Sequence, residues 1–177
     1  INALPLASVD TEKINIIDSN YRKRAQGEPL LEDSLNTGVG LIKIHPGISP
    51  QLIESLADLY DGVVFEGTGL GHLPLHRIDN DAKPLRDSIR YLRKQGVIMC
   101  MTSQCLYGRI NMNVYRTGRE LLNLGVIPCE DMLPETALVK LMWVLGKTDD
   151  YERVKQLMLT NIAGEMSGVT RTDVYLR

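Results

Sequence analysis

Cysteine and histidine are scarce in this 177-residue sequence, which carries three of each. The cysteines stand at Cys100, Cys105 and Cys129, and an odd number gives no disulfide framework. Zinc sites use paired cysteines or histidines at short spacing, and the histidines do not supply that pattern; they are His45, His72 and His76. We therefore expect buried, reduced thiols, a reducing compartment and no metal ligands.

The sequence also lacks an excess of positive charge and any long apolar run. Its formal net charge is −2, whereas a protein that grips phosphates by bulk charge normally shows a basic face. No segment approaches the roughly 18 to 20 apolar residues that a membrane-spanning helix needs, and no signal-peptide pattern opens the chain. We expect a soluble, cytoplasmic protein with no membrane partner.

Apolar runs typical of buried strands alternate with segments of helical spacing. The runs lie at residues 39–44, 62–66, 97–101 and 125–127. The helical segments lie at residues 50–60, 85–92, 119–124 and 134–145, and a last helix to about residue 159 has Asp149 and Glu152 spaced as a capping pair. This alternation predicts an α/β fold with an open parallel sheet of about four strands and helices on both faces.

The chain divides into three parts. Residues 1–38 form a linker with a hairpin-like excursion, in which 13–17 is a short strand candidate, and we interpret them as the remnant of a preceding domain. Residues 39–160 form the α/β domain, and residues 161–177 form a polar C-terminal tail. Because the sequence opens at Ile1 without methionine, we expect the natural protein to extend further upstream.

Ligands of open parallel sheets bind beyond the carboxyl ends of the strands, which here means the loops after residues 44, 66, 102 and 128. Alternating glycines in the loop at 67–78 allow a sharp turn and a close approach to a ligand. This loop does not match a dinucleotide-binding fingerprint, because His72 stands where the third glycine belongs. A binding loop and a tight surface turn both stay open.

No pair of residues stands out as nucleophile and base. The candidates at the strand ends are Thr68, Thr102, Ser103, Cys105, His45 and His72, and their spacing singles out no pair. The acidic residues Glu130, Asp131 and Glu135 surround the start of a helix, where the helix dipole favours carboxylates. The basic residues Arg109, Arg116 and Arg119 are weak candidates for binding an anion or a partner carboxylate.

Several long stretches resemble the C-terminal domain of asparaginase-family amidohydrolases. They are residues 108–115 (GRINMNVY), 118–122 (GRELL), 125–128 (GVIP), 130–137 (EDMLPETA) and 140–146 (KLMWVLG). Within that family the sequence most resembles the D subunits of archaeal glutamyl-tRNA(Gln) amidotransferases. The resemblance includes residues 21–24 (YRKR) and 161–165 (NIAGE).

The resemblance implies a subunit that releases ammonia from glutamine through a threonine nucleophile. The E subunit of the amidotransferase would use ATP and magnesium to activate Glu-tRNA(Gln) and would convert it to Gln-tRNA(Gln) with that ammonia. The family's catalytic threonines, aspartate and lysine lie in the preceding domain, so the resemblance implies no catalytic residue and no bound cofactor in this chain.

The family's C-terminal domain also implies a homodimer in which a glycine-rich loop faces the active site of the neighbouring copy. The residues here that match this loop are Thr68, Gly69, Gly71 and His72. Bacterial relatives carry asparagine at the position aligned with His72. Two other functions stay open at this point: a free cytosolic L-asparaginase or glutaminase, and a non-catalytic α/β binding module of flavodoxin-like shape.

Overall fold

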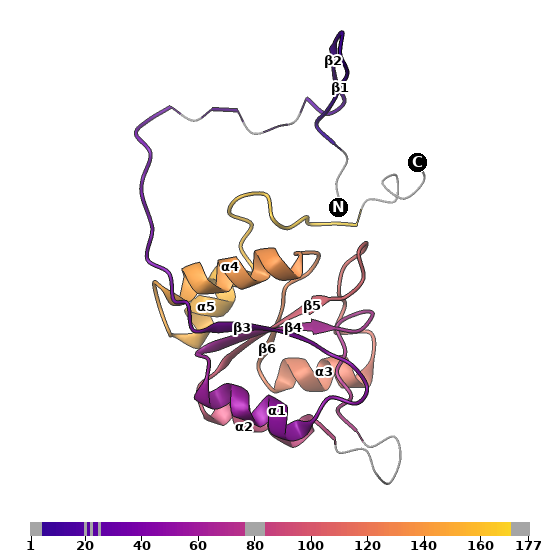
Figure 1. Cartoon of the computed structure of the whole chain (residues 1–177), viewed down its shortest axis with the longest axis vertical. Helices are drawn as coiled ribbons and strands as arrows, with labels where there is room; N and C mark the ends of the chain where they lie inside the picture. The colour runs from indigo at the N-terminus through magenta and orange to yellow at the C-terminus, as the bar shows by residue number, and fades with distance from the viewer. Residues whose placement is uncertain (1–4, 20, 22, 25, 77–83, 171–177) are drawn as a thin grey trace.

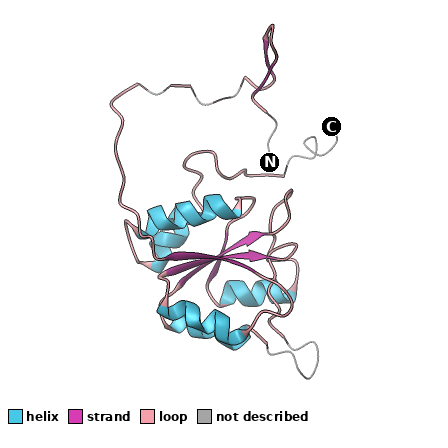
Figure 2. Ribbon diagram, viewed as in Figure 1, coloured by secondary structure: helices cyan, strands magenta, loops and turns pink. Residues whose placement is uncertain are grey.

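Four parallel strands, adjacent in the order in which they occur along the chain, form the centre of the molecule (Figures 1 and 2). They are β3 (Val39–Lys43), β4 (Gly62–Gly67), β5 (Ile98–Ser103) and β6 (Val126–Pro128). The computed structural model describes residues 5–19, 21, 23–24, 26–76 and 84–170. The predicted α/β fold with a four-stranded parallel sheet is confirmed.

Helices cover both faces of this sheet. On one face lie α1 (Pro50–Ser55), its 3-10 continuation η1 (Leu56–Asp58), α2 (Arg86–Lys94) and α3 (Arg116–Asn123). On the other face lie α4 (Pro134–Leu145) and α5 (Tyr151–Met158). Figure 2 shows the two helical layers on opposite sides of the strands.

The two layers have different origins. Right-handed crossovers between strands in sequential order place their helices on the same face, so α1, α2 and α3 share one layer. The second layer is formed by the helices that follow the last strand. The expectation of helices on both faces is therefore right, but crossover handedness explains only the first layer.

Alternate residues of the strands supply two separate cores. Phe65 and Met99 point into the layer of α1 and α2, whereas Val64 and Cys100 point into the layer of α4. All four side chains are fully buried. Burial on both faces explains why these strands are continuous apolar runs in the sequence and do not alternate with polar residues.

Local signals set several helix ends. The Ser49 side chain accepts a hydrogen bond from the amide of Gln51, and Pro50 occupies the first position of α1, as expected for a helix start. The start of α5 differs from the prediction by one residue. Its N-cap is Asp150, whose carboxylate accepts from the amide of Arg153, so the predicted capping pair of Asp149 and Glu152 is wrong.

The segment before the domain forms a two-stranded antiparallel hairpin that stands apart from the sheet (Figure 1). Its strands are β1 (Ala7–Val9) and β2 (Ile14–Ile16), the second within the predicted strand. The linker then returns to α4, where the Ser34 hydroxyl donates to the carbonyl of Gly146. Residues 1–4 and 22, residues 77–78 of the predicted loop, and residues 171–177 lie outside the described residues.

None of the helices in the described part of the chain is long and apolar enough to cross a bilayer.

Candidate functional site

The loop after β4 turns back on itself at the carboxyl edge of the sheet. Thr68 and His72 form an isolated antiparallel bridge, with backbone hydrogen bonds of 3.0 and 3.1 Å between them. The turn requires left-handed backbone at Gly69 (φ 50°) and Gly71 (φ 92°). The alternating glycines of the sequence therefore serve a tight turn, and the turn is built into the end of a central strand.

Neighbouring strands hold this loop in place. The Ser103 hydroxyl donates to the carbonyl of Gly69 at 2.6 Å, and the amide of Gln104 donates to the carbonyl of Gly67 at 2.8 Å. On the other side, the amide of Asn111 donates to the carbonyl of Leu70 at 3.0 Å. The loop is thus fixed by hydrogen bonds from two separate segments.

The Gln104 side chain ties together the ends of the strands. Its amide nitrogen donates to the carbonyl of Glu66 at 2.9 Å and to the carbonyl of Ile44. Ile44 directly follows β3, and Glu66 is the second-last residue of β4. A single side chain on the loop after β5 therefore joins the ends of three strands. The predicted loops at the carboxyl edge do come together.

The loop is only partly exposed. Thr68 and Gly69 are exposed, but Gly71 is buried and the His72 side chain is half-buried. The His72 ring meets the ring of Tyr115 edge-on, with the centroids 5.3 Å apart and an interplanar angle of 66°. Glycine at position 71 lets Ile110 pack closely against the loop, because a Cβ there would lie 3.2 Å from Ile110 Cβ.

One polar atom of His72 makes no hydrogen bond within the described residues. Its Nε2 is buried and has no hydrogen-bond partner among the described residues. A buried ring nitrogen without a partner typically costs about 1 to 3 kcal/mol.

The other candidate nucleophiles at this edge have structural partners or are solvent-exposed. The Thr102 hydroxyl is buried and donates to the carbonyl of Phe65 at 3.2 Å. Cys105 and His45 are exposed. The Thr68, Thr102 and Ser103 hydroxyls all donate to backbone carbonyls.

The arginine candidates bind within the chain. Arg116 Nε lies 2.8 Å from a carboxylate oxygen of Glu120, and His76 Nε2 lies 3.0 Å from the other oxygen. The hydrogen bond from Arg116 lowers the pKa of Glu120, and His76 acts in the same direction. Arg119 donates to the carbonyl of Asn113 at 2.8 Å. Both arginines thus have partners within the described chain.

The acidic candidates lie before and within the first turn of a helix as the sequence predicts, but none of them is its N-cap. The N-cap of α4 is Leu133, and only Glu135 lies in its first turn. Glu130 adopts a left-handed backbone (φ 55°) and its carboxylate lies 3.4 Å from Arg109 Nε, while Asp131 accepts a hydrogen bond from the amide of Ser167 at 2.9 Å. Glu135 thus occupies the position that the helix dipole favours, whereas Glu130 contacts Arg109 and Asp131 contacts Ser167 of the tail.

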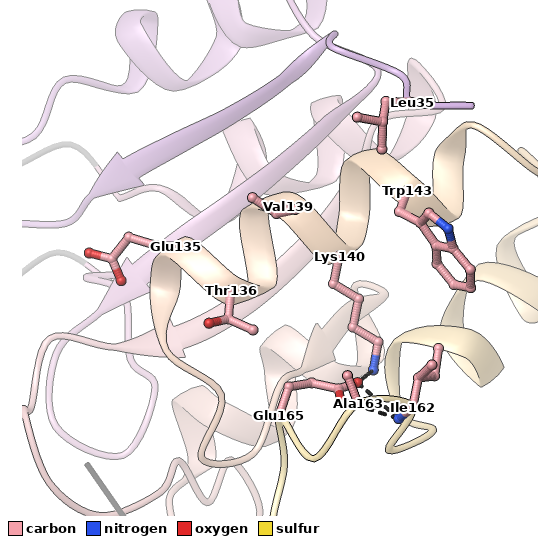
Figure 3. A pocket seen from close by; sticks show the side chains of 9 residues that line it. All are labelled: Leu35, Glu135, Thr136, Val139, Lys140, Trp143, Ile162, Ala163 and Glu165. Carbon is pink, nitrogen blue, oxygen red and sulfur yellow. Dashed lines mark hydrogen bonds and ion pairs between the residues drawn. The ribbon is translucent and has the colours of Figure 1, made fainter. Parts of the chain in front are cut away.

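A second feature, which the sequence does not predict, is an apolar hollow of about 490 Å³ beside α4 (Figure 3). The linker contributes Leu35, α4 contributes Val139 and Trp143, and the tail contributes Ile162. Lys140 also lines the hollow. Lys140 lies three residues after Ala137 and four before Val144 on the buried stripe of α4, and this helical spacing is the sequence signal for a buried charge.

Comparison with known proteins places the fold. Residues 38–158 match the family described as the glutaminase/asparaginase C-terminal domain. The chain belongs to this family. Its structure is similar to that of the thermostable L-asparaginase from Thermococcus kodakarensis, with a TM-score of 0.82 and 35% identity over 96% of this chain and 49% of that chain.

Proteins named as D subunits of glutamyl-tRNA(Gln) amidotransferase are more similar in sequence. The one from Pyrococcus horikoshii is 54% identical over 100% of this chain and 39% of its own length. The one from Methanothermobacter thermautotrophicus is 52% identical, with the same coverage of both chains. The chain thus spans about two fifths of the length of these relatives, and the predicted resemblance to D subunits is confirmed.

Proposed function

We propose that this chain is the C-terminal part of the D subunit of a glutamyl-tRNA(Gln) amidotransferase, the subunit that releases ammonia from glutamine. In this proposal the E subunit receives the ammonia and converts Glu-tRNA(Gln) to Gln-tRNA(Gln) with ATP and magnesium, in the cytoplasm. The observation that carries it is 54% identity to a protein of that name across the whole chain, against 35% to the solved asparaginase.

The proposal assigns the chemistry to residues outside this chain. Covalent catalysis needs a nucleophile with a positioned base, and the described strand-end residues offer no such pair. The 177-residue chain should therefore release no ammonia from glutamine or asparagine above background. Activity that is lost on mutating one of its own residues would contradict this assignment.

Within the chain, we assign His72 a contact with the active site of a neighbouring copy in a homodimer. An imidazole can donate a hydrogen bond to a substrate carboxylate or to a partner side chain, and the Nε2 of His72 has no partner among the described residues. Because this atom is buried in the isolated chain, the proposal requires the loop to shift when the neighbouring copy docks. A hydrogen bond to a charged group is typically worth about 1.5 to 3 kcal/mol. Thr68, Gly69 and Gly71 would serve by shaping the turn that presents it.

The test is His72→Ala in the full-length D subunit with the E subunit and tRNA(Gln) present. The rate constant for glutamine hydrolysis should fall roughly 10- to 150-fold, because about 1.4 kcal/mol corresponds to a factor of ten. His72→Asn, which supplies the residue of the bacterial relatives, should keep more of the activity. His45→Ala is the matched control, since His45 is an exposed histidine on the neighbouring strand-end loop.

A lowered thermal midpoint with unchanged hydrolysis in His72→Ala would show that the loop is only a structural turn.

A free asparaginase or glutaminase is the second candidate function, favoured by the similarity to the solved L-asparaginase. Copurification with the E subunit and hydrolysis that depends on tRNA(Gln) would separate the two, because a free amidohydrolase needs neither.

A further inference from the structure

The C-terminal segment at residues 161–169 runs from the end of α5 along α4 toward the carboxyl edge of the sheet (Figure 1). Its first attachment is the buried pair of Lys140 and Glu165, whose charged atoms lie 2.6 Å apart (Figure 3). Lys140 Nζ also donates to the carbonyls of Met158 and Thr160 at 3.0 and 2.6 Å. This attachment fixes the segment against the domain before it reaches the edge.

The second attachment joins the segment to the carboxyl edge itself. The amide of Ser167 donates to Asp131 Oδ1 at 2.9 Å, and the Ser167 hydroxyl donates to Asp131 Oδ2. Arg109 donates to the carbonyls of Ser167 and Gly168 at 2.6 and 3.1 Å. The guanidinium group is thus held by the backbone of a segment that is 58 and 59 residues away along the chain.

Arg109 begins the stretch that supports the His72 loop. The next residue, Ile110, donates its amide to the carbonyl of Glu130 at 2.9 Å and lies against Gly71 so closely that a Cβ there would be 3.2 Å from Ile110 Cβ. Asn111 then holds the carbonyl of Leu70 at 3.0 Å. A continuous series of contacts therefore leads from the C-terminal segment to the residue beside His72.

We propose that residues 165–168 act as a positioning element for the His72 loop, with Arg109 as the positioning residue that connects them. The links are hydrogen bonds, peptide bonds and the close packing of the Ile110 side chain on Gly71, so releasing the C-terminal segment frees the stretch at 109–111 and then the loop. The proposal rests on the function proposed for His72. It adds that the tail, although remote in sequence, controls the position of the His72 side chain.

The first measurement is amide hydrogen exchange in the 177-residue chain with Arg109→Lys and, separately, Ser167→Ala. Lysine keeps the charge but lacks the planar fork that reaches two carbonyls. The amides of Asn111 and His72 should exchange roughly 2- to 30-fold faster, the range expected for mutations along a coupled network. Arg116→Lys is the matched control, because Arg116 pairs only with Glu120 in the described chain and touches no tail residue.

Unchanged exchange at Asn111 and His72 in both variants would overturn the proposal, whatever the role of His72.

The second measurement is a double-mutant cycle on glutamine hydrolysis in the full-length D subunit with its E subunit. Arg109→Lys should lower kcat/KM roughly 2- to 30-fold in the wild-type background and have no further effect in His72→Ala.

The cycle separates the failure of this proposal from the failure of the proposed function. An equal loss in both backgrounds shows that Arg109 acts elsewhere and overturns the positioning role. If His72→Ala alone leaves hydrolysis unchanged, the proposed contact of His72 with the neighbouring active site is wrong. The tail then has no effect on hydrolysis through His72. If His72→Ala is impaired while Arg109→Lys is fully active, only the positioning role is wrong.

Discussion

Lys140 and Glu165 form a buried ion pair in which Nζ lies 2.6 Å from Oε1, with side chains only 6% and 9% exposed. The other two protons of Nζ go to backbone carbonyls. The Glu165 carboxylate also accepts the amides of Ile162 and Ala163. A buried charge is tolerated when it is both paired and hydrogen-bonded, and this arrangement meets both conditions.

Breaking this pair should be costly. Glu165→Gln leaves the Lys140 charge without its counterion, and we expect the free energy of unfolding to fall by about 3 to 5 kcal/mol in urea titrations. Glu32→Gln is the control, because Glu32 pairs with Lys147 at the surface and its loss should cost at most about 1 kcal/mol. Equal losses in the two variants would show that burial does not strengthen the Lys140 pair.

The same pair gives a stability that depends on pH. Burial alone would raise the pKa of Glu165, but the hydrogen bonds from Lys140 and the backbone amides outweigh it and lower the pKa from 4.5 to about 2. Since the folded pKa lies below the unfolded value, the stabilisation is complete above about pH 4.5 and is lost as the pH falls toward 2.

The expected size follows from the shift. At about 1.4 kcal/mol per pKa unit, wild type should lose about 3 kcal/mol more than Glu165→Gln between pH 5 and pH 2. Denaturant titrations of both proteins at several pH values measure this difference directly. Parallel pH profiles would mean that Glu165 does not keep its charge through this range.

The strands of this fold can be predicted from the sequence because their signal is local. Runs such as the one around Phe65 are apolar on both faces, and a parallel sheet between helical layers is the arrangement that buries them. The start of α5 was less predictable, because Asp149 and Asp150 offer the same chemistry one residue apart. Backbone geometry decides between them.

The site was harder to predict because its contacts join distant parts of the chain. The sequence indicates a glycine-rich turn at Gly69 and Gly71, but not that Ile110 packs on the turn or that the His72 ring meets Tyr115 edge-on. Likewise, nothing near Arg109 in the sequence indicates that its side chain donates to backbone carbonyls of the tail. Long-range backbone hydrogen bonds leave no periodic pattern to read.

The three cysteines should differ sharply in reactivity. Cys100 is buried in β5, and its hydrogen bond with Cys129 together with burial raises the pKa of its thiol well above the ordinary value. Cys105 is exposed. A thiol reagent should therefore label Cys105 rapidly and Cys100 only as fast as the sheet opens.

Cys105→Ser provides the control for this labelling. It should remove the fast phase and leave the slow phase unchanged, because the slow phase reports the buried thiols. Rapid labelling of Cys100 in the native protein, identified by mass spectrometry of its peptide, would contradict its place in the sheet.

Gly118 shows how packing can reverse a helix preference. It lies buried within α3, where alanine would ordinarily favour the helix by about 1 kcal/mol. A Cβ at this position, however, would overlap the carbonyl oxygen of Met112 and lie 2.8 Å from its Cα. Both are backbone atoms, so neither can move aside as the end of a flexible side chain would.

Gly118→Ala should therefore destabilise the protein by about 1 to 3 kcal/mol in denaturant titrations, the usual cost of overpacking. Gly47→Ala is the control, since the nearest atom to a Cβ there is 3.8 Å away, and its stability should change by at most about 1 kcal/mol. Because Met112 follows the stretch that supports the His72 loop, the strain in Gly118→Ala should also speed amide exchange at Asn111. A Gly118→Ala protein as stable as the wild type would show that α3 can withdraw from residue 112 at no cost.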